Sequence, residues 1–381
     1  MQKHHKRIVL FPFPGDSLGG SAISATLFLK EIQKYPQWQV LVVVHVAYPL
    51  ARWFEAQGIP VEVLADTPVY NPKKKPLRRL ADLLQARRSI QKVLKRHQAS
   101  LVHSNDIRTH ITWSFGLLGT QVQHIWHQRT KWSKSILATL LVRYADQRVC
   151  ISRFVEAGLR ADTGLDSVLV PNPLKKRSPI GSTASHKERL FSWKKEQAEK
   201  SFVVGYVGAY KAQKRPKDFV DIVQETKNKV GAHVRWIMIG KDGDYTLADM
   251  MKYARELEVL DVLSIHPFQE NIADWYSAMD CLIATSEDEG LGRNIIEAMA
   301  ENTIIVASNS GGHVELIEDQ RTGFLVQLGD IRAYTDVMQS IIRKGALNDS
   351  IRNAAREFVT EQYELGRSME KMLAVYSNLL E

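Results

Sequence analysis

The chain has 381 residues and a formal net charge of +9, with 44% hydrophobic and 24% charged residues. This composition is typical of globular proteins and excludes collagen, coiled-coil and largely disordered chains, and the length predicts two domains at roughly 100–200 residues each. Two cysteines are too few for a disulfide framework or a four-thiolate zinc site, and no apolar run approaches the roughly 18–20 residues of a membrane-spanning helix.

The first part of the chain alternates short apolar runs with helical patterns. The apolar start is broken by prolines and a Gly-rich turn, which favours a buried first strand over a signal peptide and so predicts a cytoplasmic protein. Strands are expected at 7–11, 39–45, 61–64, 147–151 and 167–170, and in two further runs that end at His103 and His127; helices are expected at 21–34, 51–57 and 76–97. This alternation predicts a parallel sheet with helices on both faces.

The positive charge is concentrated in the segment 71–98. This segment contains ten Lys or Arg residues and one acid, Asp82, so it carries +9, whereas the rest of the chain has 41 residues of each sign. Leu77, Leu80, Leu84, Ile90 and Leu94 recur at helical spacing and can form one apolar stripe. Two interpretations remain open: a half-buried helix with a solvated basic face, or a helix that attracts anionic lipid headgroups or a phosphorylated acceptor. Nucleic acid is not expected, because no nucleic-acid-binding motif accompanies the charge.

The second part of the chain repeats the alternation after a polar stretch. Residues 171–201 have the composition of a linker with one helix near 187–200. Strands are then expected at 202–207, 234–239, 262–265, 281–285, 304–307 and 323–326, and helices at 217–227, 245–256, 272–278 and 294–300. The two halves therefore predict two similar α/β domains, whose ligands would bind beyond the carboxyl ends of the strands.

The most informative stretch is SEDEGLGRNIIEAMA, which spans 286–300. Glu289 and Glu297 are eight residues apart, and Gly290 and Gly292 make a continuous helix between them unfavourable. A strand end, a glycine turn and a helix starting near Arg293 are expected. Such a turn offers backbone N–H groups to an anion. Glu289 would then lie at the mouth of a cleft, and Glu297 would reach a ribose hydroxyl.

This stretch resembles the E-x7-E signature of retaining glycosyltransferases with two Rossmann domains (GT-B), especially family four. Other family-like segments follow in the expected order: GGS at 19–21, His103 and His127 at strand ends, CISRF at 150–154, VPNP at 170–173, VGAYKAQKRPKDF at 207–219, GG at 311–312 with Glu315, and TG at 322–323. The resemblance implies two Rossmann-like domains facing across a cleft. Residues 1–170 would bind the acceptor, residues 171–360 would bind the nucleotide sugar, and a helix within 361–381 would pack back on the first domain.

The resemblance also implies a role for individual residues. Catalytic roles are expected for Glu289, His127 and Lys214, with Lys214 holding the diphosphate. Donor binding is expected of Gly19, Gly20, Lys214, Arg215, Leu291, Gly292, Arg293 and Glu297, and contact with the acceptor or a membrane of Arg129, Lys131, Lys73, Lys74, Lys75, Arg78 and Arg79. The arginine that the family usually has five residues before the lysine is replaced by Ala209. Arg293 or Arg215 is the predicted substitute.

No cofactor or metal is expected. Asp242 and Asp244 form a D-x-D pair of the kind that holds a metal in the other large glycosyltransferase fold, but they follow a second-domain strand and are interpreted as a turn. His124 and His127 have no evident third partner for zinc. The diphosphate charge would instead be stabilised by Lys214 and N–H dipoles.

The resemblance predicts a retaining hexosyltransferase that uses a nucleotide sugar, with UDP favoured by family frequency. Its acceptor would be a cell-envelope glycan or a lipid-linked precursor, and it would attach peripherally to an anionic inner membrane face. Alternatives on the same fold are a nucleotide-sugar epimerase or a transferase to a small soluble acceptor. An alternative of another class is a non-catalytic protein that binds lipid or nucleic acid through the basic helix.

Overall fold

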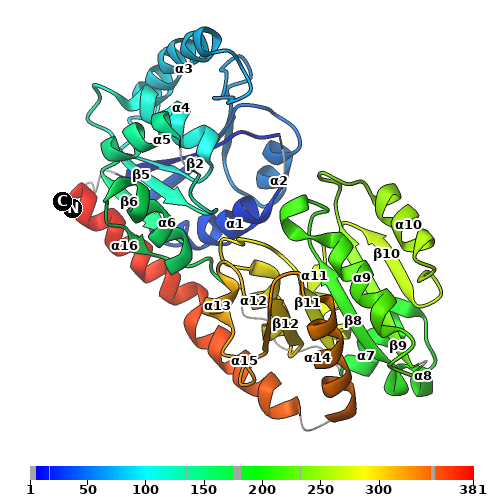
Figure 1. Cartoon of the computed structure of the whole chain (residues 1–381). Coiled ribbons are helices and arrows are strands. Elements are labelled where there is room, and N and C mark those ends of the chain that lie inside the picture. The colour runs from blue at the N-terminus through cyan, green and yellow to red at the C-terminus, as the bar shows by residue number, and fades with distance from the viewer. Residues whose placement is uncertain (1–5, 17, 134, 175–181, 232, 345–347) are drawn as a thin grey trace. The chain divides into compact units, whose positions relative to one another are not determined.

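A computed structural model describes residues 6–16, 18–133, 135–174, 182–231, 233–344 and 348–381 (Figure 1). The chain divides into two compact units. The first comprises Met1–Lys175 together with Leu365–Glu381, and the second comprises Lys176–Glu364. Among the described residues, no helix combines the length and the apolar character needed to cross a bilayer.

The first unit is built on a parallel sheet. Within the described residues its strands are β1 (Arg7–Phe13), β2 (Trp38–Val44), β3 (Val61–Val63), β4 (Leu101–Ser104), β5 (Gln123–Gln128), β6 (Gln147–Cys150) and β7 (Val168–Leu169). They lie in the order β3-β2-β1-β4-β5-β6-β7. The order therefore reverses direction between β1 and β4, as in a Rossmann fold.

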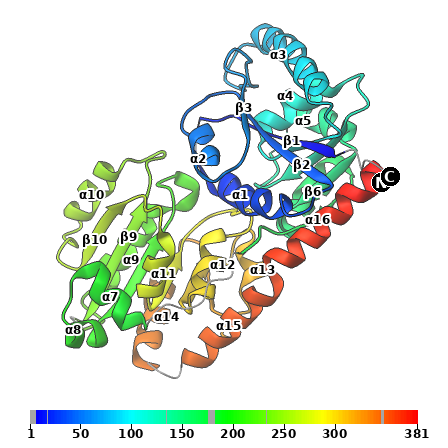
Figure 2. The ribbon, with the colours of Figure 1, turned by 180° about the vertical axis from the view of Figure 1, so that it is seen from behind.

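Helices cover both faces of this sheet. They are α1 (Gly20–Ile32), α2 (Leu50–Ala56), α3 (Pro76–Arg96), α4 (Ile107–Leu117), α5 (Ile136–Leu141), the 3-10 turn η1 (Val142–Tyr144), α6 (Arg153–Thr163) and α16 (Leu365–Leu380). Successive residues of β1 point to opposite faces. Val9 and Phe11 pack with α1 and α16, whereas Leu10 packs with α3 and α4. Figure 2 shows α1 and α16 side by side.

Helix α3 differs from the sequence-based expectation in the side that it buries. Leu83, Ala86, Ile90, Val93 and Leu94 are buried. Leu77, Leu80 and Leu84, which were expected in the same stripe as Ile90 and Leu94, are instead exposed. Because 3.6 residues form one turn, these three leucines lie on the side opposite the buried face.

The second unit repeats the architecture. Its strands within the described residues are β8 (Phe202–Val207), β9 (Val234–Gly240), β10 (Leu263–Pro267), β11 (Cys281–Ala284), β12 (Ile304–Ser308) and β13 (Phe324–Val326). All neighbours are parallel, in the order β10-β9-β8-β11-β12-β13. The predicted fold class of two Rossmann-like domains is therefore confirmed.

The helices of the second unit are α7 (Thr183–Phe191), α8 (Lys195–Lys200), the 3-10 turn η2 (Ala212–Lys214), α9 (Pro216–Thr226), α10 (Leu247–Glu256), α11 (Ile272–Ala278), α12 (Arg293–Ala300), α13 (His313–Leu316), α14 (Ile331–Lys344) and α15 (Asp349–Gln362). The expectation of a linker with one helix was wrong for the part after residue 181, where α7 and α8 form. Lys187 of α7 is buried and pairs with Asp280 at 2.6 Å, which fixes α7 to the sheet.

Candidate active site

The sequence-predicted donor residues other than Gly19 and Gly20 lie around one place in the second unit. The strand order reverses between β8 and β11, and in open α/β sheets ligands bind beyond the carboxyl ends of strands at such a switch point. The loop after β8 carries Lys214 and Arg215. The loop after β11 carries Glu289, Leu291 and Gly292. Two segments about 75 residues apart therefore meet where a Rossmann-like domain holds its ligand.

Lys214 and Glu289 join these loops directly. The Lys214 ammonium donates a hydrogen bond to Oε2 of Glu289. Burial alone would raise the pKa of Glu289, but the charge and hydrogen bond of Lys214 outweigh burial and hold this pKa below its ordinary value. Glu289 is therefore a carboxylate at neutral pH, beside a cation.

Backbone contacts fix this pair in place. Thr285 Oγ1 donates to the carbonyl oxygens of Lys214 at 2.9 Å and Arg215 at 3.0 Å. The Glu287 amide donates to the Gln213 carbonyl at 2.8 Å, and the Gln213 side chain donates to the Asp288 carbonyl at 3.0 Å. The lysine loop is thus tied to the glutamate loop on both sides of the ion pair.

The glycine bend before α12 has a conformation that other residues rarely adopt. Gly292 has φ +99°, in the left-handed region that favours glycine. Close approach of backbone explains a second glycine pair. A Cβ on Gly311 would lie 2.6 Å from the Glu289 backbone, and one on Gly312 would lie 2.6 Å from the Gly290 carbonyl oxygen. The bend that carries Glu289 and Leu291 therefore rests against the segment that follows β12.

Helix α12 begins directly after the bend, as expected, at Arg293. Its first turn is anchored to β8, because the Asn294 side chain donates to the Val207 carbonyl at 3.0 Å. Arg293 Nε donates to Glu297 Oε1 at 2.6 Å. The predicted phosphate cation and the predicted ribose acceptor are thus paired with each other one turn apart.

The other predicted residues of this unit have different partners. Arg215, at φ +48°, pairs with Asp218 at 2.7 Å. The two aspartates of the D-x-D sequence bind backbone: Asp242 accepts from the Leu247 amide and Asp244 from the Ala212 amide, both at 2.8 Å. Among the described residues, no cluster of His, Cys, Asp and Glu side chains has the geometry of a metal site.

Sequence reasoning missed His313, which lies beneath the glycine bend. Its Cδ2 would be 3.1 Å from a Cβ on Gly292. Ser308 Oγ donates to the Ser286 carbonyl at 2.5 Å and so accepts from His313 Nδ1 at 3.1 Å. This assigns the proton to Nδ1, and Nε2 has no hydrogen-bond partner within the described residues. Burial lowers the pKa of His313 to about 4, although Glu289 opposes the shift. The only sequence signal was its position after the glycine pair.

In the first unit, the predicted glycines lie at the corresponding switch point. Gly19 precedes α1 and Gly20 begins it, and both follow β1. A Cβ on Gly19 would meet no atom within 4 Å, so the packing of the described residues does not itself require glycine there. Contact of Gly19 and Gly20 with a donor stays a prediction.

His127 and His103 belong to a buried hydrogen-bond chain. Tyr376 of α16 lies 2.6 Å from His103 Nδ1, and His103 Nε2 lies 2.9 Å from His127 Nδ1. Arg129 also contacts His127 Nδ1, at 3.2 Å, and donates to Asn105 at 2.8 Å. Arg129 thus braces the end of β5.

The donors in this chain assign the tautomers. Arg129 can only donate, so His127 Nδ1 accepts, and its remaining proton lies on Nε2. His103 Nε2 then donates to His127, and Tyr376 donates to His103 Nδ1. Burial, and next the Arg129 charge, lower the pKa of both histidines well below the ordinary value, so both are neutral. His127 Nε2 has no partner at hydrogen-bond geometry in the part of the chain that the structure describes.

His124 points away from this chain, because residues three apart on a strand face opposite sides of the sheet. Its Nε2 lies 2.8 Å from Ser104 Oγ. Ser104 also contacts His110 at 2.6 Å, and His110 stacks on Trp126 with ring centroids 4.3 Å apart. His124 and His127 therefore do not converge on one point.

The basic residues of the segment before and within α3 divide into two groups. Lys73 and Lys75 are exposed. Lys74 pairs with the buried Asp82 at 2.6 Å, Arg78 pairs with it at 3.3 Å, and Arg79 donates to the Tyr70 hydroxyl at 3.2 Å. Lys74 and Arg78 thus neutralise an internal acid, whereas Lys73 and Lys75 are exposed. Contact of these five basic residues with an acceptor or a membrane stays a prediction.

A cavity of about 350 Å³ lies beyond the carboxyl ends of β1, β2 and β3. Asp16 and His45 line it, as do Lys74, Arg78 and Asp82 from the start of α3 and the segment before it. Arg108 of α4, also in the lining, binds both oxygens of Asp16 at 2.6 and 2.9 Å. The walls thus carry charged groups of both signs.

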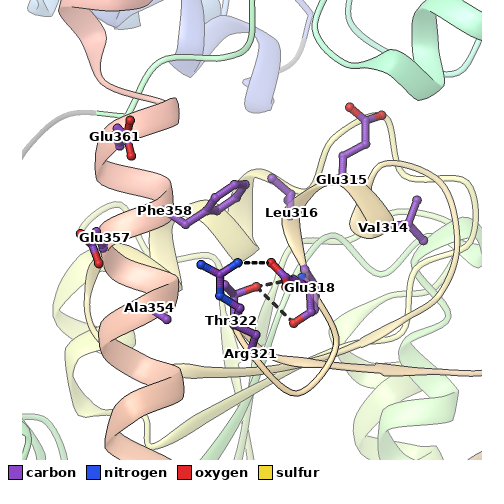
Figure 3. Close-up of a pocket in the computed structure, with 11 residues that line it drawn as sticks. Val314, Glu315, Leu316, Glu318, Arg321, Thr322, Ala354, Glu357, Phe358 and Glu361 are labelled. Atoms are coloured by element: carbon purple, nitrogen blue, oxygen red, sulfur yellow. Dashed lines mark hydrogen bonds and ion pairs between the residues drawn. The ribbon is translucent and has the colours of Figure 1, made fainter.

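A second cavity, of about 510 Å³, lies in the second unit between α15 and the segment 314–322 (Figure 3). The acidic residues of its lining are Glu315, Glu318, Glu357 and Glu361, and Arg321 is bonded to Glu318. None of the predicted donor residues lines it. This cavity therefore does not contain the Lys214–Glu289 pair.

Comparisons with known proteins match the two units to two families. Residues 43–175 match the model described as Glycosyltransferase Family 4, and residues 187–358 match Glycosyl transferases group 1. A putative glycosyltransferase, EpsD of Bacillus subtilis, is 24% identical over 184 residues, 48% of this chain. The match covers 47% of the length of that relative, so the chain spans about half of it. An Escherichia coli UDP-Gal:alpha-D-GlcNAc-diphosphoundecaprenol alpha-1,3-galactosyltransferase is 22% identical over 77% of this chain and 79% of its own.

Solved structures support the fold. Anabaena Alr3699/HepE in complex with UDP and glucose superposes with a TM-score of 0.82 at 20% identity, covering 98% of this chain and 100% of that chain. A mutant of Staphylococcus aureus TarM, in complex with UDP and two other ligands, gives a TM-score of 0.76 at 12% identity, covering 99% and 100%. At these identities the likeness establishes the GT-B fold alone.

Proposed function

We propose that this chain, a GT-B glycosyltransferase that resembles family four, moves a hexose-type sugar from a nucleotide diphosphate to an acceptor hydroxyl with retention of configuration. The observation that carries this proposal is the Lys214–Glu289 pair at the switch point of the second sheet. Departure of the diphosphate leaves negative charge on oxygen and positive character on the sugar ring. A cation and a carboxylate held side by side match these two charges.

We infer that both ion pairs of the donor site exchange partners when a ligand binds. A diphosphate at Lys214 would take over the ammonium and leave the Glu289 carboxylate to accept sugar hydroxyls. A ribose at Glu297 would likewise release Arg293 to the phosphates, so that Arg293 replaces the family arginine absent at Ala209. Backbone N–H groups around Leu291 and Gly292, at the start of α12, add fixed dipoles. In the unliganded protein each pair keeps its partly buried charges satisfied.

A UDP-sugar is the proposed donor. The Anabaena structures contain UDP, UDP-glucose, or UDP with glucose, and the E. coli relative is a UDP-Gal-dependent transferase. Metal-independent transfer is supported by Lys214 at the diphosphate and by the turn-forming roles of Asp242 and Asp244, each of which accepts a backbone N–H.

The proposed acceptor is a cell-envelope glycan or its lipid-linked precursor. The relatives include a capsular polysaccharide biosynthesis glycosyltransferase of Staphylococcus aureus, 24% identical over 48% of this chain, and the E. coli enzyme named for a diphosphoundecaprenol acceptor. The cavity beyond β1, β2 and β3 is the proposed acceptor site, because it carries Lys74, Arg78 and Arg108 that can contact a phosphorylated acceptor. Peripheral attachment to an anionic inner membrane face fits such an acceptor.

The test has two stages. UDP-, GDP- and ADP-sugars are screened for thermal stabilisation, since a ligand that binds only the folded state raises the melting temperature. The stabilising donor is then incubated with lipid-linked and soluble acceptors, and the anomeric configuration of the product is read by NMR. A retained anomer without added metal supports the proposal. An inverted anomer, or sugar conversion without acceptor as in an epimerase, contradicts it.

A further inference from the structure

Helix α3 has an apolar face that no described residue of its own unit covers. Leu77 is 84% exposed, Leu80 49% and Leu84 48%. They recur at intervals of three and four residues and so form a row along one side of the helix. The opposite side of the same helix is packed in the unit's core through Ala86 and Ile90. The leucine row is therefore not needed for folding of this unit.

Cations surround this row. Lys73 and Lys75 lie just before its first leucine, and Arg88 lies one turn beyond Leu84 on the same side; all three are exposed. The only acid of the segment, Asp82, is 3% exposed and bonded to Lys74 and Arg78. The outward charge of this part of the surface is therefore positive.

We propose that this leucine face of α3 (Leu77, Leu80 and Leu84, with Lys73, Lys75 and Arg88) docks on an anionic lipid bilayer. A helix with an apolar row and a basic surround lies in the plane of the interface, with its apolar side among the upper acyl chains. The cations contact lipid phosphates while their aliphatic stems remain beside the leucines. A nucleic-acid backbone would match the charges but would leave the leucines in water, so charge complementarity and the apolar row together favour the bilayer.

The same helix connects this face to the proposed acceptor cavity. Lys74, Arg78, Asp82 and Gln85 line the cavity beyond β1, β2 and β3. Leu77, Leu80 and Leu84 alternate with them along the first two turns. A docked α3 therefore places the cavity at the level of the headgroups, where the phosphate of a lipid-linked acceptor lies. This last step rests on the proposed function, whereas docking itself does not.

The experiment measures binding of the full chain to vesicles by co-sedimentation, with phosphatidylglycerol-rich and pure phosphatidylcholine vesicles compared. We expect binding to the anionic vesicles only. Leu77→Ser, Leu80→Ser and Leu84→Ser together should weaken it by about tenfold or more. Lys73→Gln, Lys75→Gln and Arg88→Gln together should weaken it comparably, and NaCl at about 1 M should weaken wild-type binding by shortening the screening length to about 3 Å.

Matched controls remove equivalent groups elsewhere. Met251→Ser with Leu260→Ser removes exposed apolar side chains of the second unit, and Lys194→Gln with Lys195→Gln and Lys200→Gln removes three exposed charges. Both should bind vesicles like the wild type. Tryptophan fluorescence gives a second readout. The emission maximum of Leu80→Trp should shift to shorter wavelength when anionic vesicles are added.

Three results would overturn the proposal. The leucine variant binds anionic vesicles as tightly as the wild type; the wild type binds a short DNA duplex but no vesicles; or the wild type is a dimer that the leucine variant dissociates, without vesicle binding by either. Lys214→Ala separates this proposal from the proposed function, because it should lose donor binding and keep vesicle binding.

Discussion

The hydroxyl of Tyr376 lies 2.6 Å from Nδ1 of His103, although the two residues are 273 positions apart. This contact joins the last helix of the chain to the central sheet of the first unit. It also begins the buried hydrogen-bond chain that includes His127, for which a catalytic role is predicted.

Removing that hydroxyl should destabilise the first unit. Tyr376→Phe leaves a buried acceptor, His103 Nδ1, without its donor, at a cost of about 1–3 kcal/mol. Urea unfolding should show this loss. Tyr144→Phe is the matched control, because Tyr144 is 67% exposed and should unfold like the wild type. Equal stability of all three proteins would contradict the assigned hydrogen bond.

Acid should destabilise the first unit through its buried histidines. Burial lowers the pKa of His103, His110 and His127 well below 6.5, and that of His124 to about 3. Because the unfolded chain binds protons first, stability is full above pH 6.5 and falls as the pH drops towards the folded pKa, by at most about 1.4 kcal/mol per pH unit for each histidine.

Urea unfolding between pH 7.5 and 5 measures this slope. His124→Gln should reduce the slope of the unfolding free energy against pH by the contribution of one proton, at most about 1.4 kcal/mol per pH unit. His233→Gln, at an exposed histidine of the second unit, should leave it unchanged. A wild-type stability that does not depend on pH in this range would show that the histidines are charged or solvated.

Lys214→Ala should weaken nucleotide binding more than loss of a neighbouring lysine does. A hydrogen bond to a charged group is worth about 1.5–3 kcal/mol, so we expect UDP affinity to fall by about 10–100-fold. Isothermal titration calorimetry measures the affinity. Lys211→Ala removes an exposed lysine from the same loop and is the control. Equal losses in both variants would mean that the loop acts only through its overall charge.

Arg293→Ala should lower donor affinity if Arg293 stands in for the missing family arginine. The variant also leaves Glu297 without its partner at 2.6 Å, which adds negative charge near the phosphates. Adding Ala209→Arg to this variant should restore UDP binding in the same calorimetric assay. Unchanged binding in Arg293→Ala would remove Arg293 from the donor site.

The fold was predictable because apolar runs of strand length alternate with helical patterns through both halves. The expected strand at 234–239 is β9 (Val234–Gly240), and the expected helix at 272–278 is α11 (Ile272–Ala278). Helix α3 was predicted with the wrong buried side. Its sequence contains two leucine-rich rows, one through Leu80 and one through Leu83, and only packing on the sheet decides between them.

The donor site was predictable as a set of residues but not as a set of contacts. Motif order identifies Lys214 and Glu289, yet only the strand order β8-β11 shows that their loops are neighbours. The Arg293–Glu297 pair follows from a spacing of four on a helix, which favours ion pairs. No sequence pattern indicates the contacts of His313 and Tyr376. Tyr376 contacts His103, 273 positions away, and His313 packs beside the backbone of Gly292.

The return of α16 to the first unit has a consequence for how the protein is made. A ribosome completes residues 176–364 before it reaches α16, so the second unit can finish folding while the first still lacks its closing helix. Until then Phe28 and Trp38, which meet Tyr376 edge to ring, have that side uncovered. A premature stop near codon 364 would therefore destabilise the first unit rather than the second. The apolar surface left exposed on the first unit would then be bound by chaperones or cut by proteases.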